Sequence, residues 1–522
     1  MMPTAWKRAR SLAISLIVFG LLSSAGCAPR RPVVTTRAWV AGCAEPVFDP
    51  DGPPHAVRWA MERLLSRGLV ELDSTGRARP AAAESVSVSA DGRTWSFRLR
   101  EGLRFTDGSP ATSEDFRVAL LAGLPREDHG SRAWLLAAVT GVDRVRAGRT
   151  LPALGVEAPD PRTLVLRLSA PDSLLPLKLA LPGVATPWKR RTGIAWSEAV
   201  GLGPYRVVDE SDGRSLLLAR AADCVVADAA ADTLRVRFVL GAPRVRTLLR
   251  AGAADLAWPL PPTFLEQAVP EGYVIGSSPA APARRLLLVL RDDVPPTTRT
   301  AARQALAHAL NRGTLLEALR GRARAEPGWV PGAGPFDFPR LDAGESRAWL
   351  ARGKLGASLH VTLAFDADLA GAEVARSLQG EWARQGFYAS LRGQRGEPAL
   401  EEPLRAAAAQ AQLVESQALV PGAVGLLAGL VMPPRGPAVG SFRTGWRTRE
   451  FDPWLLPGHR AGPLDAAGLQ ARLVEERNVL PLAELPWLWA ARHGAATVRV
   501  SARFGPEFAS ALPLAAAAQG SR

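Results

Sequence analysis

Residues 84–116 read ESVSVSADGRTWSFRLREGLRFTDGSPATSEDF, and their pattern decides the fold class. Two β-rich runs flank an Ala-Asp-Gly turn, which predicts a hairpin. In the second run Phe97 and Leu99 alternate with arginines, so one face of the strand should be buried and the other solvated. Thr112 then begins a helix, with Asp115 three residues later as a partial capping box. A hairpin followed directly by a capped helix indicates a mixed α/β domain.

Similar strands and helices are expected on both sides of this stretch. They alternate without a strict order, and no repeat of solenoid length recurs, so a multi-lobed α/β protein is predicted. Helices are expected at 55–67, 300–311 and 369–385, and strands at 69–73, 163–168, 205–210, 215–220, 234–240, 359–365 and 387–391.

Length and charge limit the classes of protein to consider. A chain of 522 residues, 47% hydrophobic, is long enough for several domains at roughly 150 residues each. The net charge of +14 comes from 64 basic and 50 acidic residues, and all but four of the basic residues are arginines. These arginines are spread along the chain, whereas a nucleic-acid binder gathers them on one face or arm. We therefore expect no nucleic-acid partner.

The first 27 residues resemble a bacterial lipoprotein signal. Three basic residues precede an apolar run at 12–22, and Ser-Ser-Ala-Gly then leads into Cys27. The run suits the apolar region of a signal peptide and is short for a membrane span. Ser24 stands where the lipobox usually has Leu, and an ordinary secretory signal is the alternative. We expect export and lipidation of Cys27.

Two cysteines, Cys43 and Cys224, remain after such processing. Export brings them into an oxidising compartment, where an even number of cysteines permits a disulfide. Two separately buried thiols are the other interpretation, since the sequence does not give the distance between the Cα atoms that a disulfide requires.

No pattern of catalytic or metal-binding residues is recognisable. The six histidines stand apart, and no cysteine pair has zinc-site spacing. The Gly353-Lys354 pair lacks the remainder of a P-loop. The segment Gly201-Leu202-Gly203-Pro204 superficially suggests a phosphate loop, but Pro204 has no backbone N–H to donate. We predict a protein that is not an enzyme and that holds neither a metal nor a cofactor.

Several segments together resemble one family, the family 5 extracellular solute-binding proteins, which include the oligopeptide- and dipeptide-binding components of ABC importers. Residues 62–120 follow that family's opening pattern, from a helix through "LR.g..F.DG.p" to a capped helix. Gly201 to Tyr205 is similar to its G-T-G-P-Y, which explains the glycines without a phosphate. Further similarities, in the same order, lie at 299–316, 450–452 and 473–489, and the resemblance spans roughly 33 to 505.

The resemblance implies a periplasmic-binding-protein type II-like α/β fold, in which two lobes joined by a hinge carry an extra N-terminal subdomain. The implied organisation is a lipoprotein signal peptide (1–26), a tether (27–36), a first lobe (37–255) with the inserted subdomain (about 74–190), a second lobe (256–480), and a return to the first lobe (481–522).

By the same resemblance, the function is delivery of a peptide-like or other small organic solute to the permease of an ABC importer. The protein would be a monomer, lipid-anchored on the periplasmic or extracellular face of a membrane. The alternative is a ligand-binding sensor, or a diverged binding lipoprotein without its own permease.

The resemblance also places candidate site residues. Glu45 and Trp258 match segments that line the family's ligand cleft, where Glu45 would face an amine. Trp446 stands near the Tyr of the family's "g.Y.np" pattern, and each Trp is equally compatible with core packing. Family members that bind peptides present an Asp to the peptide amine from a strand resembling "fDl...gW.aDy.dp". The matching run, 411–421, has neither that Trp nor that Asp, and its Glu415 falls on an earlier position. We therefore expect no acidic anchor for a free peptide.

One further implication concerns the cysteines. In the resembling family the first strand and the region after the strand at 215–220 belong to the same lobe. A Cys43–Cys224 disulfide would then lie within that lobe.

Overall fold

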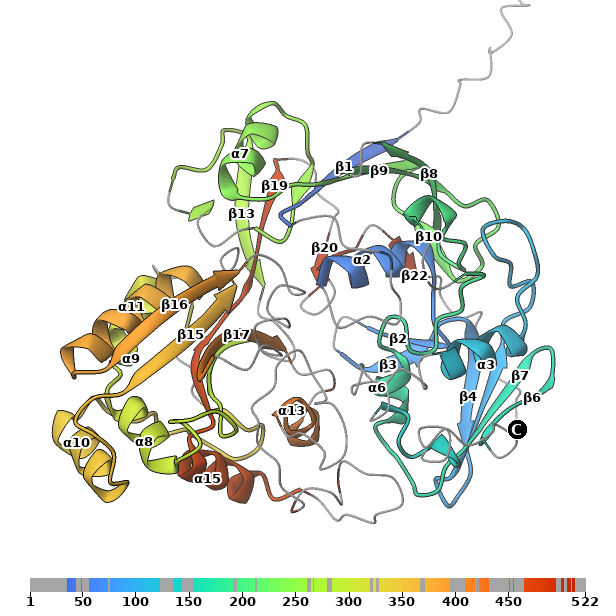
Figure 1. Cartoon of the computed structure of the whole chain (residues 1–522). Helices are drawn as coiled ribbons and strands as arrows, with labels where there is room; N and C mark the ends of the chain where they lie inside the picture. Colours follow the sequence, from blue (N-terminus) through green and yellow to red (C-terminus); the bar gives the residue numbers. More distant parts are fainter. Residues whose placement is uncertain are drawn as a thin grey trace, which may run out of the picture.

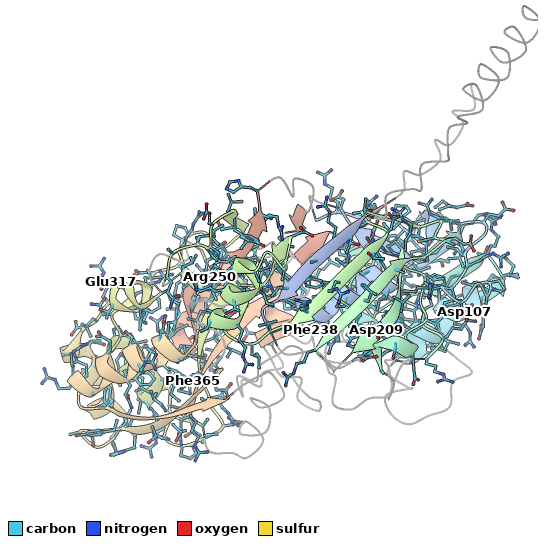
Figure 2. The ribbon with its side chains drawn as sticks, turned by 90° about the horizontal axis from the view of Figure 1, so that it is seen from above. Asp107, Asp209, Phe238, Arg250, Glu317 and Phe365 are labelled. Carbon is cyan, nitrogen blue, oxygen red and sulfur yellow. The ribbon has the colours of Figure 1, made fainter. Side chains whose placement is uncertain are left out.

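The computed structural model describes residues 35–493 except 44–47, 49–55, 74–75, 123–134, 143–153, 191–194, 212–213, 261–263, 266, 279–283, 320–322, 325–327, 367–370, 395–408, 418–419, 421, 431–449, 451–453 and 455–463, together with 499–501, 505–507 and 509–511. Figure 1 shows two bodies joined by the strands β13 and β19. Figure 2, seen from above, places Asp107 toward one end of the molecule, Glu317 and Phe365 toward the other, and Phe238 between them.

A seven-stranded sheet forms the upper part of the first body. Its strand order is β13-β19-β12-β1-β11-β9-β8. β1 pairs in parallel with β11 and β12, and the remaining neighbours are antiparallel. The strands are β1 (Thr36–Ala41), β8 (Tyr205–Ser211), β9 (Ser215–Arg220), β11 (Thr233–Phe238), β12 (Leu256–Ala257), β13 (Tyr273–Ser278) and β19 (Trp487–Arg492), accompanied by α2 (Ala56–Leu65), η1 (Trp196–Glu198), α7 (Ala242–Arg250) and β10 (Ala227–Ala229), which pairs with β22 (Ala509–Ala511).

A four-stranded sheet of order β4-β5-β7-β6 extends the first body and contains the predicted hairpin. Val88 pairs with Trp95 beside the turn, and Phe97 and Leu99 are buried while Arg98 is exposed, so the predicted alternation is confirmed. The elements are β4 (Ala83–Val88), β5 (Thr94–Leu99), β6 (Val156–Asp160), β7 (Thr163–Arg167), α3 (Ser113–Ala122), α6 (Leu175–Leu179) and the pair β2 (Val70–Leu72) with β3 (Ala78–Pro80).

The helix α3 begins as the sequence predicts, with one difference in the cap. The Asp115 carboxylate accepts a hydrogen bond from the Thr112 backbone N–H at 2.8 Å and another from the Thr112 hydroxyl at 3.1 Å. Half of a capping box is therefore present, since the hydroxyl of Thr112 donates to the carboxylate.

The second body is a five-stranded sheet of order β16-β15-β17-β14-β18. α9 and α11 contact its strands, and α8 packs on α10. The elements are β14 (Arg284–Leu290), α8 (Thr300–His308), α9 (Arg312–Ala318), α10 (Ala343–Arg352), β15 (His360–Asp366), α11 (Gly371–Arg384), β16 (Tyr388–Gln394), β17 (Ala411–Gln417), α13 (Ala423–Leu430), α15 (Ala466–Glu476) and β18 (Val479–Glu484); a small pair, β20 (Arg499–Ser501) and β21 (Gly505–Glu507), lies near the C-terminus.

Two boundaries differ from the sequence prediction. The helix expected at 300–311 ends at His308, because Asn311 caps a second helix and accepts hydrogen bonds from the backbone N–H groups of Gly313 and Thr314. The second lobe was expected from residue 256, but β12 and β13 belong to the seven-stranded sheet, and the five-stranded sheet begins only at Arg284.

Candidate functional site at the junction of the two sheets

The chain crosses between the two sheets twice, and the strand ends that flank the two crossings lie side by side. It leaves the seven-stranded sheet after β13, which ends at Ser278, and enters the five-stranded sheet at Arg284. It returns from Glu484 of β18 to Trp487 of β19. Ser278 pairs with Trp487, and Arg285 pairs with Glu484. Two adjacent connections of this kind are the arrangement of a hinge between lobes.

The carboxyl ends of the parallel strands point toward these crossings. β12 runs antiparallel to β19, so its end lies toward the β19 start. β17 is parallel to β15 and antiparallel to β14, and its last residue, Gln417, lies opposite Arg284. In open α/β sheets, ligands bind outside the carboxyl ends of the strands. The junction is therefore the candidate functional site.

Three tryptophans pack against one another at this junction. The Trp258 ring centroid lies 6.2 Å from that of Trp39 and 5.2 Å from that of Trp487. Trp39 Nε1 donates to the Trp258 carbonyl at 2.8 Å. Trp258 is fully buried and Trp487 is 7% exposed. The sequence-predicted Trp258 therefore lies at the junction, packed among aromatic rings; its contact with a solute stays a prediction.

A buried ion pair lies beside the tryptophans. The Arg284 guanidinium carbon is 4.0 Å from the Trp487 ring centroid, and Arg284 Nη2 is 3.0 Å from Glu415 Oε2. The two side chains are only 14% and 10% exposed. Glu415 is thus already paired with a cation; the absence of an acidic anchor for a peptide amine stays a prediction.

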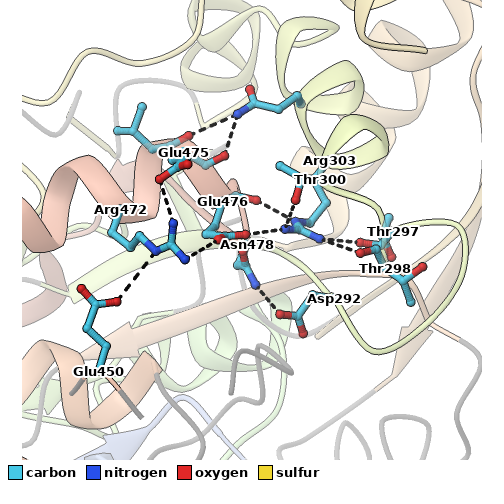
Figure 3. Close-up of polar contacts among 12 residues, drawn as sticks. Asp292, Thr297, Thr298, Thr300, Arg303, Glu450, Arg472, Glu475, Glu476 and Asn478 are labelled. Atoms are coloured by element: carbon cyan, nitrogen blue, oxygen red, sulfur yellow. Dashed lines mark hydrogen bonds and ion pairs between the residues drawn. The ribbon is translucent and has the colours of Figure 1, made fainter. Parts of the chain in front are cut away.

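A second polar network connects the end of β14 with the start of β18 in the five-stranded sheet (Figure 3). Arg303 of α8 donates to the carbonyls of Glu476 and Thr297 and pairs with the Glu476 carboxylate at 3.0 Å. Asn478, just before β18, donates to Asp292, just after β14, at 2.9 Å. Burial raises the pKa of Asp292 above its ordinary value and lowers the pKa of Arg303. These contacts hold the two strands that lead to the junction.

The segment from Gly201 to Gly203 packs closely against the end of α2. Gly203 N–H donates to the Leu65 carbonyl at 2.9 Å, and Leu202 N–H donates to the Ser66 hydroxyl at 3.1 Å. A Cβ atom at Gly201 or Gly203 would overlap the end of α2. These glycines therefore permit close packing of backbone on backbone, as the resemblance suggested in place of a phosphate loop.

The structure holds Cys43 and Cys224 as thiols, with no disulfide between them. Cys43 packs against the cluster around Trp39, whereas Cys224 packs against a different cluster and contacts the Leu202 carbonyl.

Three predicted site residues, Cys27, Glu45 and Trp446, lie outside the described residues. In the part of the chain that the structure describes, no helix is long and apolar enough to cross a membrane, and no group of three or more metal-ligating side chains comes together.

Sequence reasoning missed Arg284 and Trp487 as members of the site. A usable signal was present, since Arg284-Arg285 opens the apolar run of β14, and charged residues rarely begin so buried a strand unless they meet a partner. The partner, Glu415, is 131 positions further along the chain, and no local pattern links them.

Comparison with known proteins gives consistent results. A family model described as bacterial extracellular solute-binding proteins, family 5 (middle), matches residues 77–421. The dipeptide-binding protein DppE of Bacillus subtilis is 34% identical over 126 residues, 24% of this chain and 23% of that protein. The glutathione-binding protein GsiB of Shigella flexneri is 26% identical over 325 residues, 60% of this chain and 59% of that protein. The chain thus aligns with about a quarter to three fifths of the length of these relatives.

The fold has solved counterparts. The murein tripeptide binding protein MppA of Escherichia coli superposes with a TM-score of 0.75 and 16% identity, covering 92% of this chain and 97% of that chain. At this low identity, the likeness shows that the two proteins share a fold and shows nothing about a shared function. It confirms the predicted α/β periplasmic-binding-protein architecture.

Proposed function

Because this chain belongs to the bacterial extracellular solute-binding proteins of family 5, we propose that it captures a peptide-like or other small organic solute and delivers it to an ABC importer. The observation that supports this most strongly is the match of the family model over residues 77–421, combined with a fold that covers 97% of the murein tripeptide binding protein. The role is binding and release, without chemical change of the solute.

The junction supplies the means of capture. Two sheets direct their strand ends toward two adjacent crossings, so rotation about these crossings opens or closes the space between the lobes. A solute that contacts both lobes stabilises the closed arrangement by its differential affinity for it. Glu45, Trp258 and Trp446 are the proposed solute-contacting residues.

We further propose that Cys27 is lipidated and that residues 27–36 tether the receptor to the outer face of a membrane. The support is the basic start, the short apolar run and the Ser-Ala-Gly-Cys ending. A tether of this kind keeps the receptor near its permease and raises its effective concentration there. For the lobes, we propose boundaries that follow the two crossings, near residues 279–283 and 485–486.

An uptake experiment tests the proposal. Cells that lack the gene should deplete a defined subset of a peptide mixture from the medium more slowly, and the wild-type gene should restore the rate. A Cys27→Ser variant should restore it only partly. Unchanged depletion of every component would contradict delivery to an importer. Solute binding by the pure protein together with unchanged uptake would instead favour the alternative, a ligand-binding sensor.

A further inference from the structure

Three buried N–H donors without acceptors lie together at the junction. Trp258 Nε1, Trp487 Nε1 and Arg284 Nε have no hydrogen-bond partner among the residues that the structure describes. The two indole rings are 5.2 Å apart, and the guanidinium carbon of Arg284 lies 4.0 Å from the Trp487 ring centroid. Buried donors are normally paired, so a group of three requires an explanation.

A single unpaired indole would carry little weight, since Trp329 and Trp349 also have unpartnered Nε1 atoms elsewhere in the fold. The group at the junction differs in its number and its place. Trp487 contacts both of the other side chains, Trp258 and Arg284, and the three lie where the strand ends of both sheets meet.

The charges at the junction are already balanced. The guanidinium of Arg284 faces the Glu415 carboxylate at 3.0 Å, and this pair is nearly buried. An ammonium group entering beside it would gain no uncompensated carboxylate from this pair, and a buried charge without a partner is strongly unfavourable. Gln412 of β17, whose buried side-chain amide has no hydrogen-bond partner among the described residues, is neutral and belongs to the opposite face of the strand from Glu415.

Building on the function proposed above, we propose that the solute places an uncharged oxygen acceptor, an amide or ester carbonyl, against Trp258, Trp487 and Arg284, and that it has no ammonium group. The unpaired donors select for the acceptor. The balanced Arg284–Glu415 pair selects against ligand charge. The preferred solutes are then blocked or cyclised peptides and similar neutral carbonyl compounds.

Calorimetric titration with one tripeptide in four end states tests this. Ala-Leu-Ala is used with a free or acetylated amine and with a free or amidated carboxyl group. The acetylated forms should bind at least about tenfold more tightly than the matching free amines, since each tenfold step is about 1.4 kcal/mol. Equal or tighter binding of the free amines overturns the inference and leaves the proposed function standing. Absence of binding by all four peptides contradicts the proposed capture of peptide-like solutes.

Two matched variants show whether the indole N–H donor itself, and not only the packing of the ring, contributes to solute binding. Trp487→Phe removes Nε1–H and keeps an aromatic ring beside Arg284. Trp349→Phe does the same at a similar arrangement in α10, where the Arg352 guanidinium carbon lies 4.8 Å from the ring centroid. We expect binding of the acetylated, amidated peptide to weaken roughly three- to tenfold in Trp487→Phe, as loss of one hydrogen bond implies, and to stay unchanged in Trp349→Phe. Unchanged binding in both variants, with both folded by circular dichroism, overturns the inference.

Discussion

Removing the carboxylate of Glu415 should destabilise this protein far more than removing an exposed one. In Glu415→Ala the Arg284 guanidinium, 14% exposed in the structure, loses its partner at 3.0 Å. Breaking one half of a buried pair costs about 3–5 kcal/mol, because the remaining charge stays desolvated. The exposed pair Arg167–Glu157, with side chains 55% and 45% exposed, provides the control, and Glu157→Ala should cost less than about 1 kcal/mol.

Urea unfolding followed by intrinsic fluorescence measures the difference. Tryptophan emission is suited to it because the 15 tryptophans of the chain report on unfolding of the whole molecule. The double variant Arg284→Met/Glu415→Leu should recover most of the lost stability, since replacing both members of a buried pair by apolar residues is often neutral. A free energy of unfolding of Glu415→Ala within about 1 kcal/mol of the wild-type value would refute the reasoning. Glu415 would then be solvated and available to a solute amine.

Three further predictions concern other parts of the chain. Gly203→Ala should destabilise by at least about 1–3 kcal/mol, because the added Cβ meets the backbone at the end of α2, whereas Gly380→Ala in α11, with nothing within 4 Å, should be neutral or stabilising in the same thermal melt. Burial raises the pKa of Asp292, so the native state retains a proton that the unfolded chain releases, and stability should fall as the pH rises from about 4 toward the raised pKa. Asp292→Asn should flatten this fall in urea midpoints taken across that range, and identical slopes would contradict it. Cys27→Ser should abolish incorporation of labelled palmitate, and retained label would exclude lipidation at Cys27.

Much of the fold follows from local sequence patterns. The hairpin of β4 and β5 was predictable because turn chemistry and alternation act within a few residues, as Asp91 and Gly92 illustrate. The β8–β9 hairpin and the helix α11 were predictable for the same reason. These elements need no information from distant parts of the chain.

The boundaries and the site depended on distant contacts. β12 has only two residues, too few for any periodic pattern, and it is a strand because β1 and β19 flank it. The sequence pattern places Asn311 at the end of a helix. In the structure it caps the next helix, because the first helix already ends at His308. The pairing of Arg284 with Glu415 required the register of β14 against β17. The family resemblance supplied the architecture but not these contacts.

The most direct test of solute capture is a native mass measurement on the mature protein, purified from its own cells without denaturation. The account predicts a species heavier than the bare chain by one small molecule, which is lost on denaturation and shows no free amine by fragmentation. A single species at the mass of the bare chain, unchanged after incubation with a mixture of N-acetylated, amidated and cyclic peptides, would contradict it.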